Sequence, residues 1–129
     1  MKPSRLPLAV LTAFFAFFLA ANPAVAGDAK KGKRVFNKCK ACHDNRPGKN
    51  RVGPSLFGVV GRKAGTVPKY SYLGMKGADW TWNEKLLMEY LEDPKKFVQK
   101  RGNNRTKMMF KLTNKKQRED VIAYLKTLK

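Results

Sequence analysis

The sequence predicts an all-α domain in which three or four helices are joined by long loops. Apolar residues recur at helical spacing in residues 29–40, 82–92 and 115–128, and no segment shows the alternation of a half-buried strand. Glycine and proline are concentrated between residues 44 and 79. At 129 residues the chain has room for one small domain, and it contains no internal repeat.

The first half of the domain is expected to contain one helix and one long loop. Asp28 can cap a helix over residues 29–40, whose inward side is formed by Gly32, Val35, Phe36 and Cys39. Residues 44–79 show no sustained periodicity and are expected to be mostly loop. A loop this long inside a compact domain needs another source of order, and a large buried cofactor would supply it.

The second half is expected to be more helical. A helix over residues 82–92 is ended by Asp93-Pro94, after which a short helix starts at residue 95. Residues 99–114 form a polar, basic loop with an apolar tip. Thr113 or Asn114 caps a last helix over residues 115–128, whose inner face carries Val121, Tyr124, Leu125 and Leu128.

Residues 1–26 have the pattern of a cleaved export signal. A basic start with Lys2 and Arg5 precedes an apolar run, and the small residues Ala24-Val25-Ala26 stand before Gly27. The apolar run is shorter than the roughly 20 residues of a membrane-spanning helix, so we expect cleavage rather than an uncleaved membrane anchor. The prediction is a periplasmic domain over residues 27–129, without stable membrane insertion.

The chain is very basic, with 28 Lys and Arg against 9 Asp and Glu and a net charge of +19. Removal of Lys2 and Arg5 with the signal leaves a charge of +17. Such a field favours acidic partners and makes association salt-sensitive. Nucleic acid is the competing partner, but export separates the protein from it and no helix-turn-helix, zinc-finger or RNP pattern is present. We therefore expect no nucleic-acid binding.

Cys39-Lys40-Ala41-Cys42-His43 has the spacing of c-type haem attachment. Two thiols one helical turn apart can each bond a porphyrin vinyl group, and the next residue then lies under the iron. A thioredoxin-like pair would need a strand-then-helix setting, a structural zinc site would need four ligands, and a plain disulfide would leave the long loop without a source of order. We predict one covalent haem c per chain.

The axial ligands follow from what the sequence offers. His43 is the only histidine, so ligation by two histidines of one chain is excluded and a methionine is the usual sixth ligand of an electron carrier. Met88 falls within a predicted helix and Met75 within a flexible stretch between glycines. Met108 or Met109 in the apolar tip is the better candidate, although this tip could also be a simple apolar anchor for the loop.

The sequence resembles the class I c-type cytochromes, the family of mitochondrial cytochrome c and its bacterial relatives, over essentially all of residues 27–129. Beyond the Cys39–His43 motif, the matching segments include Gly53-Pro54-Ser55-Leu56, Gly61-Arg62-Lys63, Tyr70-Ser71-Tyr72, Trp82, Leu87-Met88-Glu89-Tyr90-Leu91, Pro94-Lys95-Lys96, Thr106-Lys107-Met108 and Arg118-Glu119-Asp120. The resemblance implies a small cytochrome c fold wrapped around one haem. The chain departs from the mitochondrial pattern in a longer stretch before Met108 and a shorter one before Trp82.

The resemblance also implies roles for single residues. It selects Met108 as the sixth ligand and places Phe110 over the haem edge, and it makes the Pro54 carbonyl the acceptor for the His43 imidazole. It implies that Tyr90 reaches towards the Met108 sulfur. The residues it assigns to the haem propionates are Arg62, Tyr72 and Trp82. It further implies that Gly32 and Phe36 pack on Val121 and Tyr124.

These features predict a monomeric one-electron carrier, for example in a respiratory chain, that docks on acidic faces of redox proteins. The basic residues expected around the haem edge are Lys38, Lys49, Arg51, Lys95, Lys96, Lys107, Lys111 and Lys115. A haem peroxidase is disfavoured because no second histidine remains as a distal acid–base group. A haem-based gas sensor and a subunit fixed in a larger complex are the competing hypotheses.

Overall fold

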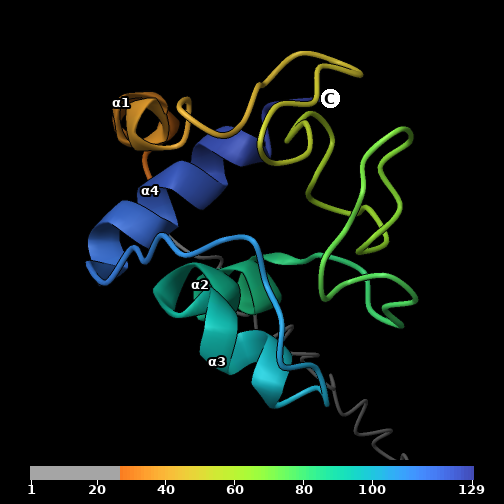
Figure 1. Cartoon of the computed structure of the whole chain (residues 1–129). Helices are drawn as coiled ribbons and strands as arrows, with labels where there is room; N and C mark the ends of the chain where they lie inside the picture. The colour runs from red at the N-terminus through yellow and green to blue at the C-terminus, as the bar shows by residue number, and fades with distance from the viewer. Residues whose placement is uncertain (1–26) are drawn as a thin grey trace, which may run out of the picture.

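The computed structural model describes residues 27–129, which form four α-helices and one 3-10 helix joined by long loops (Figure 1). The elements are α1 (Ala29–Val35), η1 (Phe36–Lys38), α2 (Glu84–Glu92), α3 (Pro94–Gln99) and α4 (Lys115–Leu125). Within this part of the chain there is no strand, only an isolated antiparallel bridge between Lys63 and Thr81. The all-α prediction is confirmed. The predicted export signal lies outside the described residues.

The first helix begins where expected and ends early. The Asp28 side chain accepts hydrogen bonds from the backbone N–H groups of Lys30 and Lys31 at 2.8 and 3.1 Å. The α-helix stops at Val35 rather than at residue 40, because the chain tightens into η1. The turn that follows carries the CxxCH motif, and the His43 N–H donates to the Cys39 carbonyl at 2.8 Å.

Helices α2 and α4 are also shorter than the sequence predicts, whereas α3 begins at Pro94, one residue before the predicted start. Helix α2 starts at Glu84 instead of residue 82, because the Asn83 side chain caps it by accepting from the Leu86 N–H at 2.8 Å. Trp82 is thereby left before the helix, next to the Lys63–Thr81 bridge. Asn114, not Thr113, caps α4, which ends at Leu125.

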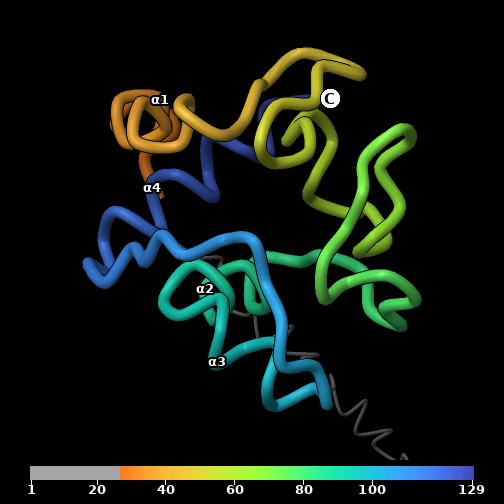
Figure 2. The backbone as a smooth tube through the Cα atoms, in the orientation of Figure 1, coloured from red at the N-terminus to blue at the C-terminus, as the bar shows by residue number. Residues whose placement is uncertain are grey.

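Helices α1 and α4 cross in close contact, which Figures 1 and 2 show in orange and blue. A Cβ on Gly32 would lie 1.9 Å from the carbonyl oxygen of Asp120, so only glycine permits this approach. One turn further, the rings of Phe36 and Tyr124 lie 5.3 Å apart. The Asp28 N–H donates to the Asp120 carboxylate at 2.8 Å and ties the start of α1 to α4.

Helices α2 and α3 form a second group, built on aromatic side chains. Trp82 contacts both Tyr90 and Phe97, with ring centroids 5.0 and 5.6 Å apart. The Arg101 guanidinium lies 3.5 Å from the Phe97 centroid. In the tube view of Figure 2 the long loop before α2, drawn in green, lies apart from the helices and forms another wall of the molecule. No helix within residues 27–129 is long and apolar enough to cross a membrane.

Candidate haem site

One cavity of about 420 Å³ collects the predicted site residues. It is enclosed by η1, α2, the long loop and the segment before α4. Its lining includes all nine of them, namely Cys39, Cys42, His43, Pro54, Arg62, Tyr72, Trp82, Tyr90 and Met108. Hydrophobic periodicity could not have predicted this convergence, because three of the nine residues lie in residues 44–79, which show no sustained periodicity. The motif and the resemblance to known segments supplied it.

The two cysteines face the cavity as free thiols. Cys39 is half-buried and Cys42 is exposed, and they are not joined in a disulfide. Burial raises the pKa of the Cys39 thiol to about 11, so it stays protonated at neutral pH, unlike the activated thiolate of a dithiol redox enzyme. Within residues 27–129 no three His, Cys, Asp or Glu side chains gather in a way that could hold a metal ion. The geometry therefore disfavours the thioredoxin-like and zinc interpretations.

His43 is fixed in one orientation. Its Nδ1 lies 2.8 Å from the Pro54 carbonyl oxygen, which can only accept, so Nδ1 carries the proton and Nε2 keeps its lone pair. A Cβ on Gly53 would lie 2.3 Å from Cε1 of the ring, so this glycine allows the backbone to press against the imidazole. Burial lowers the pKa of His43, while the hydrogen bond to Pro54 opposes that shift. A neutral imidazole held by its Nδ1 proton is the arrangement that a metal-ligating histidine requires.

The loop that carries Gly53 and Pro54 is held by a charged cluster that the sequence analysis did not predict. Asp44 is 7% exposed and accepts from Arg46 Nε and Nη2 at 2.9 and 2.7 Å, while Arg51 approaches it at 3.5 Å. These contacts hold the pKa of Asp44 well below its usual value, chiefly through the Arg46 hydrogen bond. The only sequence feature that could have indicated this cluster is an aspartate between basic residues, and that pattern is not specific in so basic a chain.

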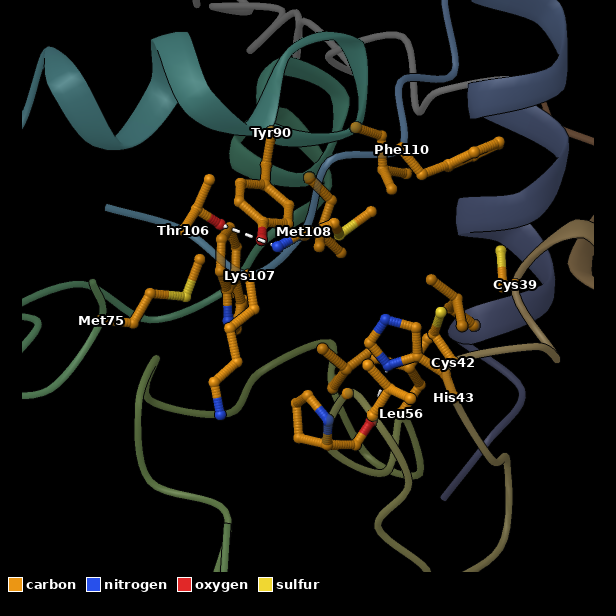
Figure 3. A pocket seen from close by; sticks show the side chains of 18 of the residues that line it. Cys39, Cys42, His43, Leu56, Met75, Tyr90, Thr106, Lys107, Met108 and Phe110 are labelled. Carbon is orange, nitrogen blue, oxygen red and sulfur yellow. Dashed lines mark hydrogen bonds between the residues drawn. The ribbon is translucent and has the colours of Figure 1, made fainter. Parts of the chain in front are cut away.

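The structure separates the two candidate methionines of the apolar tip. The Met108 N–H donates to the Thr106 hydroxyl at 3.2 Å, and the Met108 side chain is half-buried in the cavity (Figure 3). Met109 is 72% exposed, at the mouth of the cavity. The Lys107 ammonium donates to the Ser71 carbonyl at 2.7 Å and so ties the segment that carries Met108 to the long loop. Met108 is therefore the shielded thioether of the pair.

Met75 differs from its sequence-based interpretation. The expected flexible stretch between glycines is in fact packed: Met75 is 8% exposed and lines the cavity. A Cβ on Gly65 would lie 2.1 Å from the Met75 carbonyl oxygen, so the loop segments that carry Gly65 and Met75 are in contact. The flanking glycines suggested mobility, but here they permit positive φ values and close packing.

The remaining predicted residues form the polar and aromatic walls. Arg62 donates to the carbonyls of Phe57 and Ser55 at 2.9 and 3.1 Å, which leaves part of its five N–H donors for a ligand. The Tyr72 hydroxyl accepts from the Val67 N–H at 3.2 Å and keeps its own proton available. Burial raises the pKa of Tyr90 to about 12, so this phenol remains neutral.

The cavity fits a haem c in its donor set. Two unpaired thiols, one imidazole nitrogen and the shielded thioether of Met108 line one apolar space, and a polar wall could hold carboxylates. Three large apolar side chains at its mouth are exposed to solvent, namely Val52 at 65%, Met109 at 72% and Phe110 at 40%. The cavity is thus shielded inside and apolar at its opening.

Comparisons with known proteins agree with this geometry. The family model described as cytochrome c matches residues 29–129. A cytochrome c2 of Rhodopseudomonas palustris is 46% identical over 115 residues, which cover 79% of this chain and 99% of that protein. The solved cytochrome c2 of Rhodospirillum centenum superposes with a TM-score of 0.75 at 40% identity, covering 79% of this chain and 98% of that one. The solved cytochrome cH of Methylobacterium extorquens superposes with a TM-score of 0.69 at 42% identity, covering 78% of this chain and 99% of that one.

Proposed function

The chain belongs to the cytochrome c family, and from that premise we propose that it carries single electrons between redox proteins of the periplasm, with His43 and Met108 as axial ligands of its haem iron. Members of this family are electron carriers, not enzymes, and they hold haem c through the cysteines that here are Cys39 and Cys42. The bound haem supplies an iron that cycles between the ferric and ferrous states.

The His43–Pro54 hydrogen bond of 2.8 Å is the observation that carries the ligand assignment. It uses the Nδ1 proton and leaves Nε2 as a donor atom for iron, and it makes the imidazole a more basic ligand. Gly53 allows the backbone to press directly against the imidazole ring. In this proposal both residues position His43 and neither contacts the iron.

The proposal that Met108 is the second axial ligand is supported by the burial of its side chain and by its anchored backbone. The Thr106 hydroxyl accepts from its N–H, and Lys107 ties the same segment to the long loop. Tyr90 lies beside Met108 in Figure 3, where we propose that it reaches towards the sulfur. A thioether in a water-poor site favours ferrous iron and raises the reduction potential. Arg62, Tyr72 and Trp82 are proposed to hold the propionates.

We further propose that the cavity mouth is the docking surface for acidic redox proteins. The exposed apolar side chains at the mouth supply a contact area, and the eight basic residues expected around the haem edge supply an orienting field. Three of the eight pair with carboxylates of the chain itself, namely Arg51 with Asp44, Lys111 with Asp93 and Lys115 with Glu119. Of the other five, Lys38 and Lys107 line the cavity, where their ammonium groups donate to the Gln117 side chain and to the Ser71 carbonyl.

The proposed mature chain starts at Gly27, after cleavage of residues 1–26. A Cβ on Gly27 would lie 2.0 Å from the Glu119 carbonyl oxygen, so the packed part of the domain includes this residue. The Asp28 N–H is already bonded to α4. Mass spectrometry of the periplasmic protein should give the mass of residues 27–129 plus one haem, and size-exclusion chromatography should give a monomer.

The experiment that tests the ligand assignment is the absorption spectrum of the matured ferric protein. We expect the weak red band of sulfur-ligated ferric iron in the wild type, unchanged in Met109→Ala, the matched control. Met108→Ala should remove the band of the Met108–iron bond. A wild type that holds covalent haem but lacks any such band would refute the proposed ligation. The docking proposal is tested separately, because electron transfer to an acidic partner must slow as salt rises.

A further inference from the structure

Two shielded thioethers, rather than one, line the haem cavity. Residues 27–129 contain four methionines, of which Met88 does not line the cavity and Met109 is 72% exposed. Met108 is half-buried, and Met75 is 8% exposed. In Figure 3 both of these side chains enter the cavity away from the wall that carries Cys39, Cys42 and His43.

The segments that bear the two thioethers are in contact. A Cβ on Gly74 would lie 1.6 Å from the Arg105 carbonyl oxygen, so their backbones touch just before Met75 and shortly before Met108. The Lys107 ammonium reaches across to the Ser71 carbonyl at 2.7 Å. Met75 is therefore brought to the Met108 side of the cavity.

The Met75 backbone is fixed by its contacts, and its side chain lines the cavity. Its carbonyl accepts from the Ala78 N–H at 3.1 Å and packs against Gly65. The side chain has three rotatable bonds and a polarisable sulfur, so it can reach different positions in an apolar space without moving the backbone. An aliphatic residue would fill the same wall, but it could not donate a lone pair.

We propose that Met75 is a second axial-ligand site, whose thioether takes the sixth position on the haem iron when that of Met108 is absent or displaced. This inference rests on the proposed function. The exchange breaks one iron–sulfur bond and forms another, and it transfers neither an electron nor a proton. Its effect is to keep the sixth position closed, so that loss of the Met108 bond does not turn the carrier into a binder of small ligands.

The test compares the ferric wild type with Met75→Leu, Met108→Ala and the double variant, all carrying covalent haem. Leucine conserves the volume of methionine and removes the sulfur. We expect a sulfur–iron band, shifted in position, to remain in Met108→Ala and to vanish in the double variant. Met75→Leu alone should keep the wild-type band. Met109→Leu in the Met108→Ala background is the matched control and should keep the shifted band.

Binding of imidazole to the ferric iron gives a second readout. If Met75 occupies the sixth position for about nine-tenths of the time, the apparent affinity of Met108→Ala is about tenfold weaker than that of the double variant. Far-UV circular dichroism is used to check that each variant is folded. If Met75→Leu does not accumulate, Met75→Ile serves as a second sulfur-free variant.

Two results would overturn the proposal in different ways. If Met108→Ala has no sulfur band and binds imidazole as tightly as the double variant, Met75 is only an apolar wall and the proposed function stands. If Met75→Leu loses the band while Met108→Ala keeps the wild-type band, Met75 is the primary ligand. That second result overturns both the reserve role of Met75 and the assignment of Met108.

Discussion

Replacing Gly32 by alanine should destabilise the protein through the α1–α4 crossing. The added Cβ would lie 1.9 Å from the Asp120 carbonyl oxygen, where ordinary van der Waals contact begins at 3.4 Å. The two helices would have to separate by about 1.5 Å, or the backbone would have to distort, because the atom it meets belongs to a helix backbone. The same Cβ would lie 2.8 Å from the Tyr124 Cβ, so a small rotation does not relieve the clash.

The expected cost follows from two opposing effects. Overpacking of this kind costs about 3 kcal/mol, at the upper end of the usual range, because backbone atoms cannot move aside as a side chain can. Alanine recovers about 1 kcal/mol through its higher helix propensity. The free energy of unfolding should therefore fall by about 2 kcal/mol. With an m-value of about 4 kcal/mol/M in guanidinium chloride, the midpoint should fall by about 0.5 M.

Guanidinium unfolding of the haem-bound protein, followed by far-UV circular dichroism, measures this change. Lys33→Ala is the matched control, because Lys33 lies on the exposed side of the same helix and its replacement should leave the midpoint nearly unchanged. If Gly32→Ala unfolds at or above the wild-type midpoint with the same m-value, the close approach of α1 and α4 is not what requires glycine here.

Three further predictions concern the site and the stability of the fold. Gly53→Ala should weaken axial ligation by His43, because its Cβ would lie 2.3 Å from the ring; the reduction potential and imidazole binding report this. The pKa of Asp120 is lowered chiefly by the Asp28 N–H, so its stabilisation is present above 3.8 and is lost as pH falls towards the lower folded-state value. The thermal midpoint of Asp120→Asn should therefore depend less on pH than that of the wild type between pH 5 and pH 2, roughly the range over which paired carboxylates titrate. A chain that ends at Asn114 should still acquire covalent haem but should lose the cooperative unfolding transition.

Capping residues could be predicted from the sequence more accurately than helix ends. Asp28 precedes the first helix as expected, because its short carboxylate can reach the first free N–H groups. Asn83 also caps, and it moved the start of α2 two residues beyond the prediction. The predicted helix included Trp82 because it is a large apolar residue at the start of the periodic segment. The structure shows that it is buried by the aromatic cluster and not by a helix face.

The site could be predicted where its chemistry is carried by a motif. CxxCH is specific because the attachment needs two thiols one helical turn apart and a ligand directly after the second, and all three residues do line the cavity. Met75 could not be found in this way. Whether a side chain between two glycines is mobile or buried depends on contacts with Gly65 and Arg105, which are distant in sequence. The same holds for the Asp44 cluster.

The crossing of α1 and α4 also sets an order of events. The start of the helix that leads into the CxxCH motif is tied to a carboxylate 92 residues further along the chain, in α4. A helix of seven residues is not stable alone in water, so the amino-terminal segment has no lasting structure until the carboxyl-terminal one arrives.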